Sequence, residues 1–535
     1  MVVAEAPPAV QGDVASRPPL RRRALLLEAV AVAGGYLVLT LLLTYPLPLY
    51  LTNGATYGDP MLIAWALDWY SNVFPGNLIN AFNGPIFYPY PNAMFFDELF
   101  LTIALQTLPI VELTGNPLLG YNLALLAAFV ASGMGVYLLV RRWTGNRTAA
   151  FVAGVLFSFS SIRMVQSTHL HVLSIQWLPL SVYFLDRWLI GRRWFDLVGF
   201  TLAFNLQLLS AYNFVVMFPL TVAAWGMVRL VAAPKLIKPV TFVGLALAGL
   251  LTAAINFPLA RVYFSLSEQF AFSRDVNETI IYSASPLDYL SAPPNNWLYG
   301  PLSAPLRHPA WSEHSLFPGA VTLLFAVAGI AYLVSPASRG RRGLVLAAGV
   351  ATVLLWNFSL GLTPMETGWP DLRVYSWLYD HVPAMRGVRV AARAAVFVLF
   401  GMALLAGFAL AWLLPWLGQL DPFKRAGARV GLAGSSVVAA LIVGLAVVES
   451  ASIPFAPIQP VPLEPELPPV YRWLAQQPGR GAVVELPLLL HTNESWYETA
   501  HVSLDRPRAA NLERLSRVHS AEPARILSSD GRLSR

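Results

Sequence analysis

The sequence predicts an all-α polytopic transmembrane helical bundle of about eleven spans, with a small external α/β domain at its C-terminus. Of the 535 residues, 56% are hydrophobic and only 12% are charged, whereas soluble proteins carry about 25% charged residues. Several apolar runs reach the roughly 20 residues that a helix needs to cross a bilayer. The basic residues stand in short clusters between these runs, which is the pattern that sets membrane orientation.

Composition also argues against several kinds of function. The net charge of +7 comes almost entirely from arginine, and its clusters mark the ends of apolar runs, so no nucleic-acid partner is predicted. The absence of cysteine excludes disulfides, thiol catalysis and cysteine-ligated metals. We predict no cofactor and no metal site. The lipid bilayer is the first partner that the sequence implies.

Residues 1–23 are rich in Pro and Ala and end in an arginine triplet, so we expect a disordered cytoplasmic N-terminus. The apolar run that follows is too long for a cleaved signal peptide and lacks a clear cleavage site. It predicts a first span over about 24–50, which ends where Pro46 and Pro48 stop the helix.

A transmembrane domain is predicted over 24–450. A shorter apolar run at 99–113 has about 15 residues, which leaves open whether it crosses the membrane. Other runs lie near 118–140, 148–164, 170–189, 196–211, 213–232, 239–262, 315–335, 343–361, 388–416 and 428–450.

Basic clusters choose between the two topologies. If 99–113 does not cross, all the clusters between spans fall on the cytoplasmic side, whereas they are inverted if it does. The positive-inside rule therefore favours a multi-pass plasma-membrane protein with its N-terminus inside. The loops 52–98 and 263–314 and the C-terminus then lie outside.

Residues 451–535 form the last predicted unit. Seven prolines between Pro454 and Pro469 predict a stiff, extended linker. A short amphipathic helix from Val470 and a strand over Ala482–Leu486 then open an external α/β domain. The Arg- and Ser-rich tail offers nothing to complete it, so the domain is truncated or the tail is disordered.

The external loop 52–98 carries the first candidate for chemistry. It belongs to a stretch without Lys or Arg from residue 24 to residue 140. Asp59 precedes Pro60, which is the pattern of a helix N-cap and predicts an amphipathic interfacial helix over 60–74. A carboxylate at the outer surface can also accept a proton from a sugar or lipid hydroxyl. The two roles do not exclude each other.

Other residues of this loop are candidates for substrate binding. Asp97 and Glu98 are a solvated helix start or a second carboxylate group that orients the acceptor. Tyr88 and Tyr90 belong to an extended, proline-containing segment. Their rings suit the aromatic belt at a membrane interface and could equally stack on a sugar.

Arg386, Arg389 and Arg393 lie at the outer end of a predicted span, where the positive-inside rule does not place arginine. Their spacing of three and four puts them on one helix face. An unpaired charge at the depth of Arg393 is costly and therefore usually functional. Guanidinium groups bind phosphate through paired hydrogen bonds. The alternative is that they reach out to lipid head groups.

Two further groups of polar residues lie on predicted outer loops. His169 and His171 are two positions apart, so a chelating pair would need a strand or loop, and a hydrogen-bonding role is favoured over metal binding. Residues of the loop 263–314 could line the same cavity: Arg274, Asp275, Asn277, Glu278, Tyr282, Glu313 and His314.

The layout resembles that of the GT-C glycosyltransferases, polytopic enzymes that use polyprenyl- or dolichyl-phosphate sugars, and in particular the YfhO-like bacterial membrane proteins. The segments that carry the resemblance are Gly58-Asp59-Pro60, Phe87–Asn92, 114–142 and Pro383–Arg393. It covers most of 24–450. By this resemblance Asp59 matches the catalytic Asp of the first loop, and Asp97 or Glu98 loosely matches a second acidic site. Arg386 or Arg389 matches the ligands of the lipid phosphate.

The resemblance implies inverting transfer of a sugar from a polyprenyl-phosphate donor to a lipid, glycan or protein acceptor at the outer membrane face. Asp59 would remove the acceptor's proton, and the arginines would stabilise the phosphate leaving group. A lipid-linked glycan ligase or polymerase would use the same features. A transporter or flippase would need a polar path, for which the spans offer few candidates: Asn205, Gln207 and Asn256.

Overall fold

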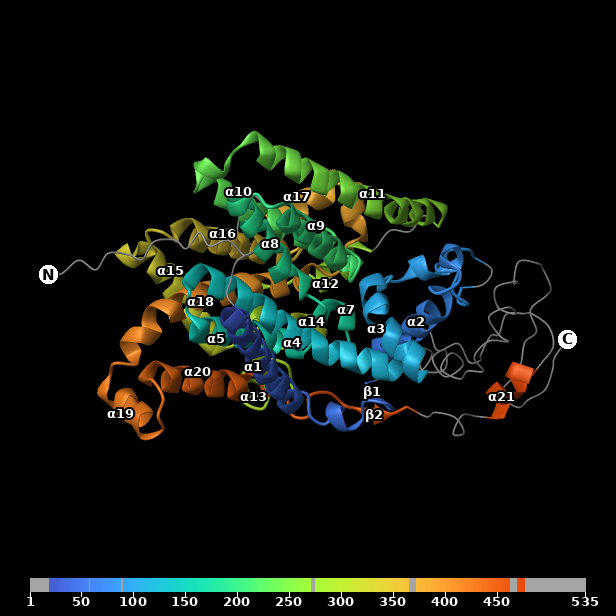
Figure 1. The fold of residues 1–535 in the computed structure, drawn as a ribbon. Helices are drawn as coiled ribbons and strands as arrows, with labels where there is room; N and C mark the ends of the chain where they lie inside the picture. Colours follow the sequence, from blue (N-terminus) through green and yellow to red (C-terminus); the bar gives the residue numbers. More distant parts are fainter. Residues whose placement is uncertain are drawn as a thin grey trace.

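The computed structural model describes residues 19–56, 58–87, 90–270, 275–364, 372–461 and 469–476. It confirms the predicted helical membrane bundle (Figure 1). Within the described residues, the only sheet is an antiparallel pair of short strands, β1 (Gly54–Ala55) and β2 (Gln459–Pro460). Six helices there are long and apolar enough to cross a membrane, or seven if a bent pair near the C-terminus is one span. The count of about eleven spans stays a prediction.

The six candidate spans contain α1 (Pro19–Leu43), α4 (Pro117–Thr144), α10 (Met217–Val231), α11 (Pro239–Gln269), α16 (Arg342–Ser359) and α18 (Ala395–Leu417). The bent pair is α19 (Asp421–Arg429) with α20 (Gly434–Ser450). Other helices of the bundle are α3 (Leu101–Thr114), α5 (Arg147–Ser158), α8 (Trp177–Gly191), α9 (Trp194–Leu208) and α15 (Ala320–Val334).

Short helices make up most of the remaining structure. They are α2 (Asp59–Val73), α6 (Ser161–Met164), α7 (Leu170–Leu173), α12 (Val276–Ile281), α13 (Tyr299–Leu302), α14 (Trp311–His314), α17 (Val374–His381) and α21 (Pro469–Gln476). Four 3₁₀ turns matter for the site: Tyr212–Phe214, Pro286–Leu290, Pro383–Gly387 and Ala391–Ala394. The others are Leu47–Leu49, Leu78–Asn80, Ala93–Phe96, Pro234–Leu236, Ala304–Leu306 and Pro336–Ser338.

α18 forms the centre of the bundle. Its sequence is apolar on every side, which is typical of a helix surrounded by other helices. It packs against α5, α15 and α16, and 89% of the most apolar 18-residue stretch of this span is buried in the protein. α11, by contrast, lies along the upper edge of Figure 1, and only 17% of its most apolar 18-residue stretch is buried in the protein. The start of α18 is therefore the most firmly held point from which a side chain can enter a site.

The two ends of the bundle differ in character. The turn between α15 and α16, which carries Arg339, Arg341 and Arg342, and the basic helix α19 lie at the left end of Figure 1. α2, α3 and the β1–β2 pair lie at the right end. These predicted cytoplasmic segments and the helix of the loop 52–98 therefore lie at opposite ends of the view.

The segment that follows α20 returns to the first external loop. β2 pairs with β1, and the Val461 backbone N–H donates to the Asn53 carbonyl at 2.7 Å. The extended linker predicted after Pro454 thus begins as a strand held close to Asp59. The strand expected over Ala482–Leu486 lies outside the described residues.

α2 is not the amphipathic surface helix that the sequence predicts. Of its 15 residues, 12 are buried in the protein. The prediction that Asp59 is the N-cap is also wrong, because the cap is Gly58, whose φ of 89° few residues other than glycine adopt. Asp59 is the first residue of the helix, and its side chain is left to make contacts outside the helix.

The predicted orientation can be tested with single cysteines, since the chain has none. Gly76 and Gly340 are both exposed, and a Cβ added at either meets no atom within 4 Å. In intact cells we expect a membrane-impermeant thiol reagent to label Gly76→Cys and to spare Gly340→Cys until the cells are opened. Labelling of Gly340→Cys but not of Gly76→Cys in intact cells would show that the orientation is the reverse of the predicted one.

Candidate functional site

A cavity of about 230 Å³ lies where the first external loop meets α7, α14 and the segment before α18. It brings together most of the residues that the sequence singled out, although they come from four separate stretches of chain. The lining residues are Asp59, Leu62, Ile63, Asp97, Glu98, Phe100, His169, His171, Asn213, Tyr282, Ser312, Glu313, Arg389 and Arg393.

Asp59 is an accessible carboxylate in the cavity lining. Its side chain is 50% exposed, and Oδ2 lies 3.3 Å from Nε2 of His169. Burial lowers the pKa of His169, and the charge of Arg393 adds to this effect. Nδ1 of His169 lies 3.3 Å from the Thr168 hydroxyl. A neutral imidazole that accepts there carries its proton on Nε2, facing Asp59.

Glu98 and Asp97 take different roles although they are adjacent. The Glu98 carboxylate accepts hydrogen bonds from the backbone N–H groups of Tyr212 and Asn213 at 2.5 and 2.9 Å. It therefore caps the break between α9 and α10. Burial raises the pKa of Glu98 to about 7 despite these bonds. Asp97 is exposed in the cavity lining.

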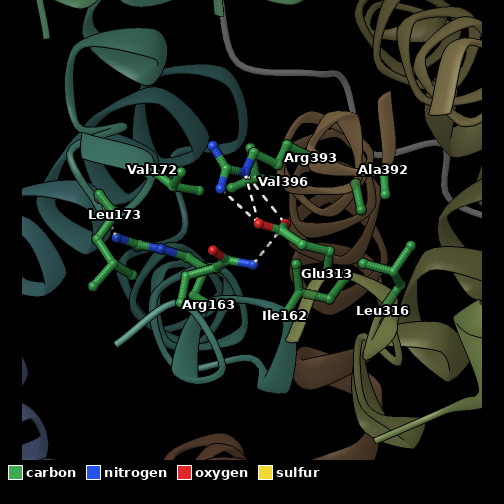
Figure 2. A pocket seen from close by; sticks show the side chains of 11 residues that line it. Ile162, Arg163, Val172, Leu173, Glu313, Leu316, Ala392, Arg393 and Val396 are labelled. Carbon is green, nitrogen blue, oxygen red and sulfur yellow. Dashed lines mark hydrogen bonds and ion pairs between the residues drawn. The ribbon is translucent and has the colours of Figure 1, made fainter. Parts of the chain in front are cut away.

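Arg393 and Glu313 form a buried ion pair, and their side chains point toward each other in Figure 2. Arg393 Nη2 lies 2.6 Å from Glu313 Oε1, and Nε lies 3.0 and 3.2 Å from the two carboxylate oxygens. Gln166 Nε2 adds a hydrogen bond of 3.4 Å to Oε2. Burial by itself would raise the pKa of Glu313, but the charge and hydrogen bonds of Arg393, together with His169 and Gln166, outweigh burial and lower this pKa to about 2.

The Arg393 guanidinium also approaches the histidine pair. Its Nη1 lies 3.5 Å from Nε2 of His171, which is itself buried. The rings of His169 and His171 are nearly perpendicular, with centroids 5.8 Å apart. Among the described residues, no three His, Asp or Glu side chains gather as metal ligands. In the cavity lining, His169 contacts Asp59 and His171 contacts Arg393, so the two histidines lie between these charged side chains.

Arg389 also lines the cavity. Its Nη1 lies 3.0 Å from Glu278 Oε1, and its guanidinium lies 5.2 Å from the centre of the Tyr282 ring. Both contacts come from α12 and the residue that follows it. The Arg389 side chain remains 36% exposed, so part of the guanidinium is available to a ligand.

The three arginines do not share a helix face, and this prediction is wrong. Residues 388–390 lie between two 3₁₀ turns, with Val388 extended. The Tyr282 carbonyl accepts a hydrogen bond from the Ala392 N–H at 3.1 Å, which holds this segment against the loop 263–314. As a result, Arg386 is exposed and is not part of the cavity lining.

Tyr90, Asp275, Asn277, Glu278 and His314 do not line the described cavity. The Tyr90 ring is 45% exposed and packs edge-on against Phe270 at 5.0 Å and against Phe96 at 6.3 Å, as a residue of an interfacial belt would. Tyr88 and Arg274 lie outside the described residues.

Sequence reasoning gave Glu313 too little weight. It appeared only as one of several polar residues of a long outer loop, yet it is the partner of the most deeply buried arginine of the site. Ser312 and Asn213 also line the cavity without having been singled out as site residues. The available signal was the position of Glu313 just before an apolar run, where a charge close to the membrane needs a partner.

Comparison with solved structures places the chain among membrane proteins of known fold. An oligosaccharyltransferase of Archaeoglobus fulgidus, in the apo form, is similar with a TM-score of 0.54 and 15% identity, over 91% of this chain and 65% of that one. The archaeal oligosaccharyltransferase AglB of the same organism, in complex with an inhibitory peptide and a dolichol-phosphate, gives a TM-score of 0.47 and 15% identity, over 92% and 61%.

ArnT from Cupriavidus metallidurans, bound to undecaprenyl phosphate, gives a TM-score of 0.43 and 13% identity, over 95% of this chain and 93% of that one. No protein-family model and no curated protein matches the sequence. The chain spans less than two thirds of the length of the oligosaccharyltransferases. At these identities the likeness concerns the fold alone.

Proposed function

Because the chain has the fold of the GT-C membrane glycosyltransferases, as its sequence predicts, we propose that it is a glycosyltransferase. It moves a sugar from a polyprenyl-phosphate donor to a lipid, glycan or protein acceptor at the outer face of the plasma membrane, with inversion. One observation carries the proposal: the half-exposed carboxylate of Asp59 and the guanidinium of Arg389 face the same cavity. The narrower likeness to YfhO-like proteins stays a prediction.

Asp59 acts as the general base in this proposal. The acceptor hydroxyl gives its proton to the carboxylate as its oxygen attacks the anomeric carbon from the face opposite the phosphate. The bond between that carbon and the phosphate oxygen breaks, and the lipid phosphate leaves with the electron pair. The neutral His169 beside Asp59 orients the carboxylate without neutralising it.

Arg389 stabilises the phosphate leaving group. A fixed positive charge lowers the barrier most where negative charge develops in the transition state, and the exposed part of Arg389 can offer paired N–H donors to phosphate oxygens. Arg393 is committed to Glu313 by three close contacts. Its role is therefore to hold the floor of the cavity.

Two alternative functions, a transporter and a ligase or polymerase, can be compared with the described structure. Asn205 and Asn256 hydrogen bond to each other at 2.8 Å between α9 and α11, and Gln207 donates to the Ser174 carbonyl at 3.0 Å. None of the three lines the cavity, which disfavours a transport path through them. A ligase or polymerase would use the same residues and differ only in the acceptor.

Transfer by the purified full-length chain in proteoliposomes tests the proposal. Polyprenyl-phosphate donors with different radiolabelled sugars are supplied with lipid, glycan and peptide acceptors in turn. We expect release of polyprenyl phosphate that depends on one donor and one acceptor class. Movement of the donor across the vesicle membrane without release would instead support a flippase.

Replacement of Arg389 with Ala should weaken binding of polyprenyl phosphate by about 1.5–3 kcal/mol, because a charge-assisted hydrogen bond is lost. This corresponds to roughly 10- to 150-fold in affinity. Arg389→Lys should recover only part of it, since the planar fork of donors is missing. The measurement is binding of the lipid to detergent-purified protein.

Arg386→Ala is the matched control, because Arg386 is a nearby exposed arginine outside the cavity lining. Equal losses in the two Ala variants would show that these arginines bind lipid head groups in general and that the cavity does not select the phosphate.

A further inference from the structure

A second buried polar cluster lies behind the cavity wall and has no part in the proposed chemical step. At its centre is His314, which is only 3% exposed. Its Nδ1 lies 2.7 Å from Asp288 Oδ2, and its Nε2 lies 2.6 Å from the Ile281 carbonyl oxygen. Asp288 Oδ2 also accepts a hydrogen bond from the Ser285 backbone N–H at 2.7 Å.

These contacts define the protonation state of His314. A carbonyl oxygen cannot donate, so Nε2 carries a proton. When Asp288 is a carboxylate, its Oδ2 can only accept, so Nδ1 carries the second proton. Without it, the lone pairs of Nδ1 and Oδ2 would face each other at 2.7 Å. The buried pair is therefore an imidazolium with a carboxylate, an arrangement that is strongly disrupted when one charge is removed.

Three titratable groups surround His314: Asp288, Glu313 and His308. The His308 ring stacks on His314 with centroids 3.9 Å apart, and its Nδ1 accepts the Ala310 N–H at 3.1 Å. Burial and the neighbouring His314 lower the pKa of His308. Burial alone would lower the pKa of His314, but its hydrogen bond to Asp288 and the charge of Asp288 outweigh burial and raise this pKa above its ordinary value.

The two contacts of His314 connect the segments that hold the two cavity arginines. Ile281 is the last residue of α12, and the same helix supplies Glu278 to Arg389, with Tyr282 next in the chain. His314 itself follows Glu313 on α14, which binds Arg393. A shift of one short helix against the other would therefore change the distance between the two guanidinium groups.

We propose that His314, in its doubly protonated form, is a positioning residue that locks α12 against α14 and so sets the placement of Arg389 and Arg393 around the donor. This inference rests on the proposed function for its effect on the donor, whereas the lock itself does not depend on any activity.

The contacts of His314 that hold α12 against α14 should weaken at alkaline pH. A group whose pKa is raised by folding contributes its full stability below the ordinary value of 6.5, and this stability is lost as the pH rises through the raised pKa. We expect both the unfolding temperature of the wild-type protein and its affinity for the donor to fall over this range. The KM for the donor should rise over the same range.

His314→Gln and Asp288→Asn test the lock in complementary ways. Gln keeps a donor but has no titrating charge, so the alkaline fall in unfolding temperature should disappear. Asn removes the carboxylate that raises the pKa of His314 against the effect of burial, so the alkaline fall should shrink or disappear. His381→Gln is the control, because His381 is exposed on α17, and its profile should match that of the wild type.

Unfolding temperature, followed by intrinsic tryptophan fluorescence of the full chain, and KM for the polyprenyl-phosphate donor are measured from about pH 6 to pH 9. An unfolding profile that is the same in the wild type and in Asp288→Asn overturns the lock, even if His314→Gln does not fold. If the unfolding temperature changes with pH as expected but the KM for the donor does not, the positioning role of His314 is overturned. Absence of transfer with every donor, with the unfolding profiles as expected, refutes the proposed function but leaves the lock in place.

Discussion

Replacing Asp59 with Asn is expected to lower the rate of sugar transfer by about 10²–10⁴-fold, the usual contribution of a general base. Asn has nearly the same shape and can keep the contact with His169, but it cannot take the acceptor's proton. Since Gly58 is the N-cap of α2, the helix does not depend on the carboxylate for capping. The measurement is transfer of labelled sugar at saturating donor, with unfolding temperature followed in parallel.

The chain contains a matched control for this variant. Asp421 is also the first residue of a helix, is also followed by proline, and lies on α19 with a side chain that is 76% exposed. Asp421→Asn repeats the chemical change at the opposite end of the bundle and should leave transfer unchanged. Near-normal transfer by Asp59→Asn would move the base to another carboxylate of the cavity, with Asp97 the first to test.

Replacing Glu313 with Gln should cost about 3–5 kcal/mol in the free energy of unfolding, because it leaves the Arg393 charge buried without its partner. Both side chains are almost fully buried, with 5% and 6% exposure, so water cannot take over the role of the carboxylate. Unfolding in a graded detergent mixture provides the measurement. We also expect transfer to be lost, since the cavity floor is displaced.

Glu278→Gln is the comparison, because it breaks the other arginine pair of the site. The side chains of Arg389 and Glu278 are 36% and 31% exposed, and pairs of this kind contribute at most about 1 kcal/mol. A double replacement, Glu313→Leu with Arg393→Met, should recover much of the stability, since a buried pair can be exchanged for apolar side chains. Equal costs for Glu313→Gln and Glu278→Gln would contradict the burial of the Arg393 pair.

The sequence by itself determined the class of the protein. Apolar runs long enough to cross a bilayer and the grouping of arginines between them are local properties, and the structure confirms a helical membrane bundle. The loop 52–98 is a candidate for the site on the same kind of evidence, because a long stretch without basic residues and with Asp59 near its start is visible in the sequence. The structure places Asp59 in the cavity lining.

The tertiary structure alone decided which polar residues meet. Arg393 and Glu313 are 80 positions apart in sequence, and Arg389 and Glu278 are 111 positions apart, so no periodicity could pair them. The spacing of the three arginines predicted a helix face, but a hydrogen bond from Ala392 to the Tyr282 carbonyl holds that segment outside a regular helix. Hydrophobic patterns determine where helices form, whereas the pairing of buried charges depends on which helices the folded chain brings together.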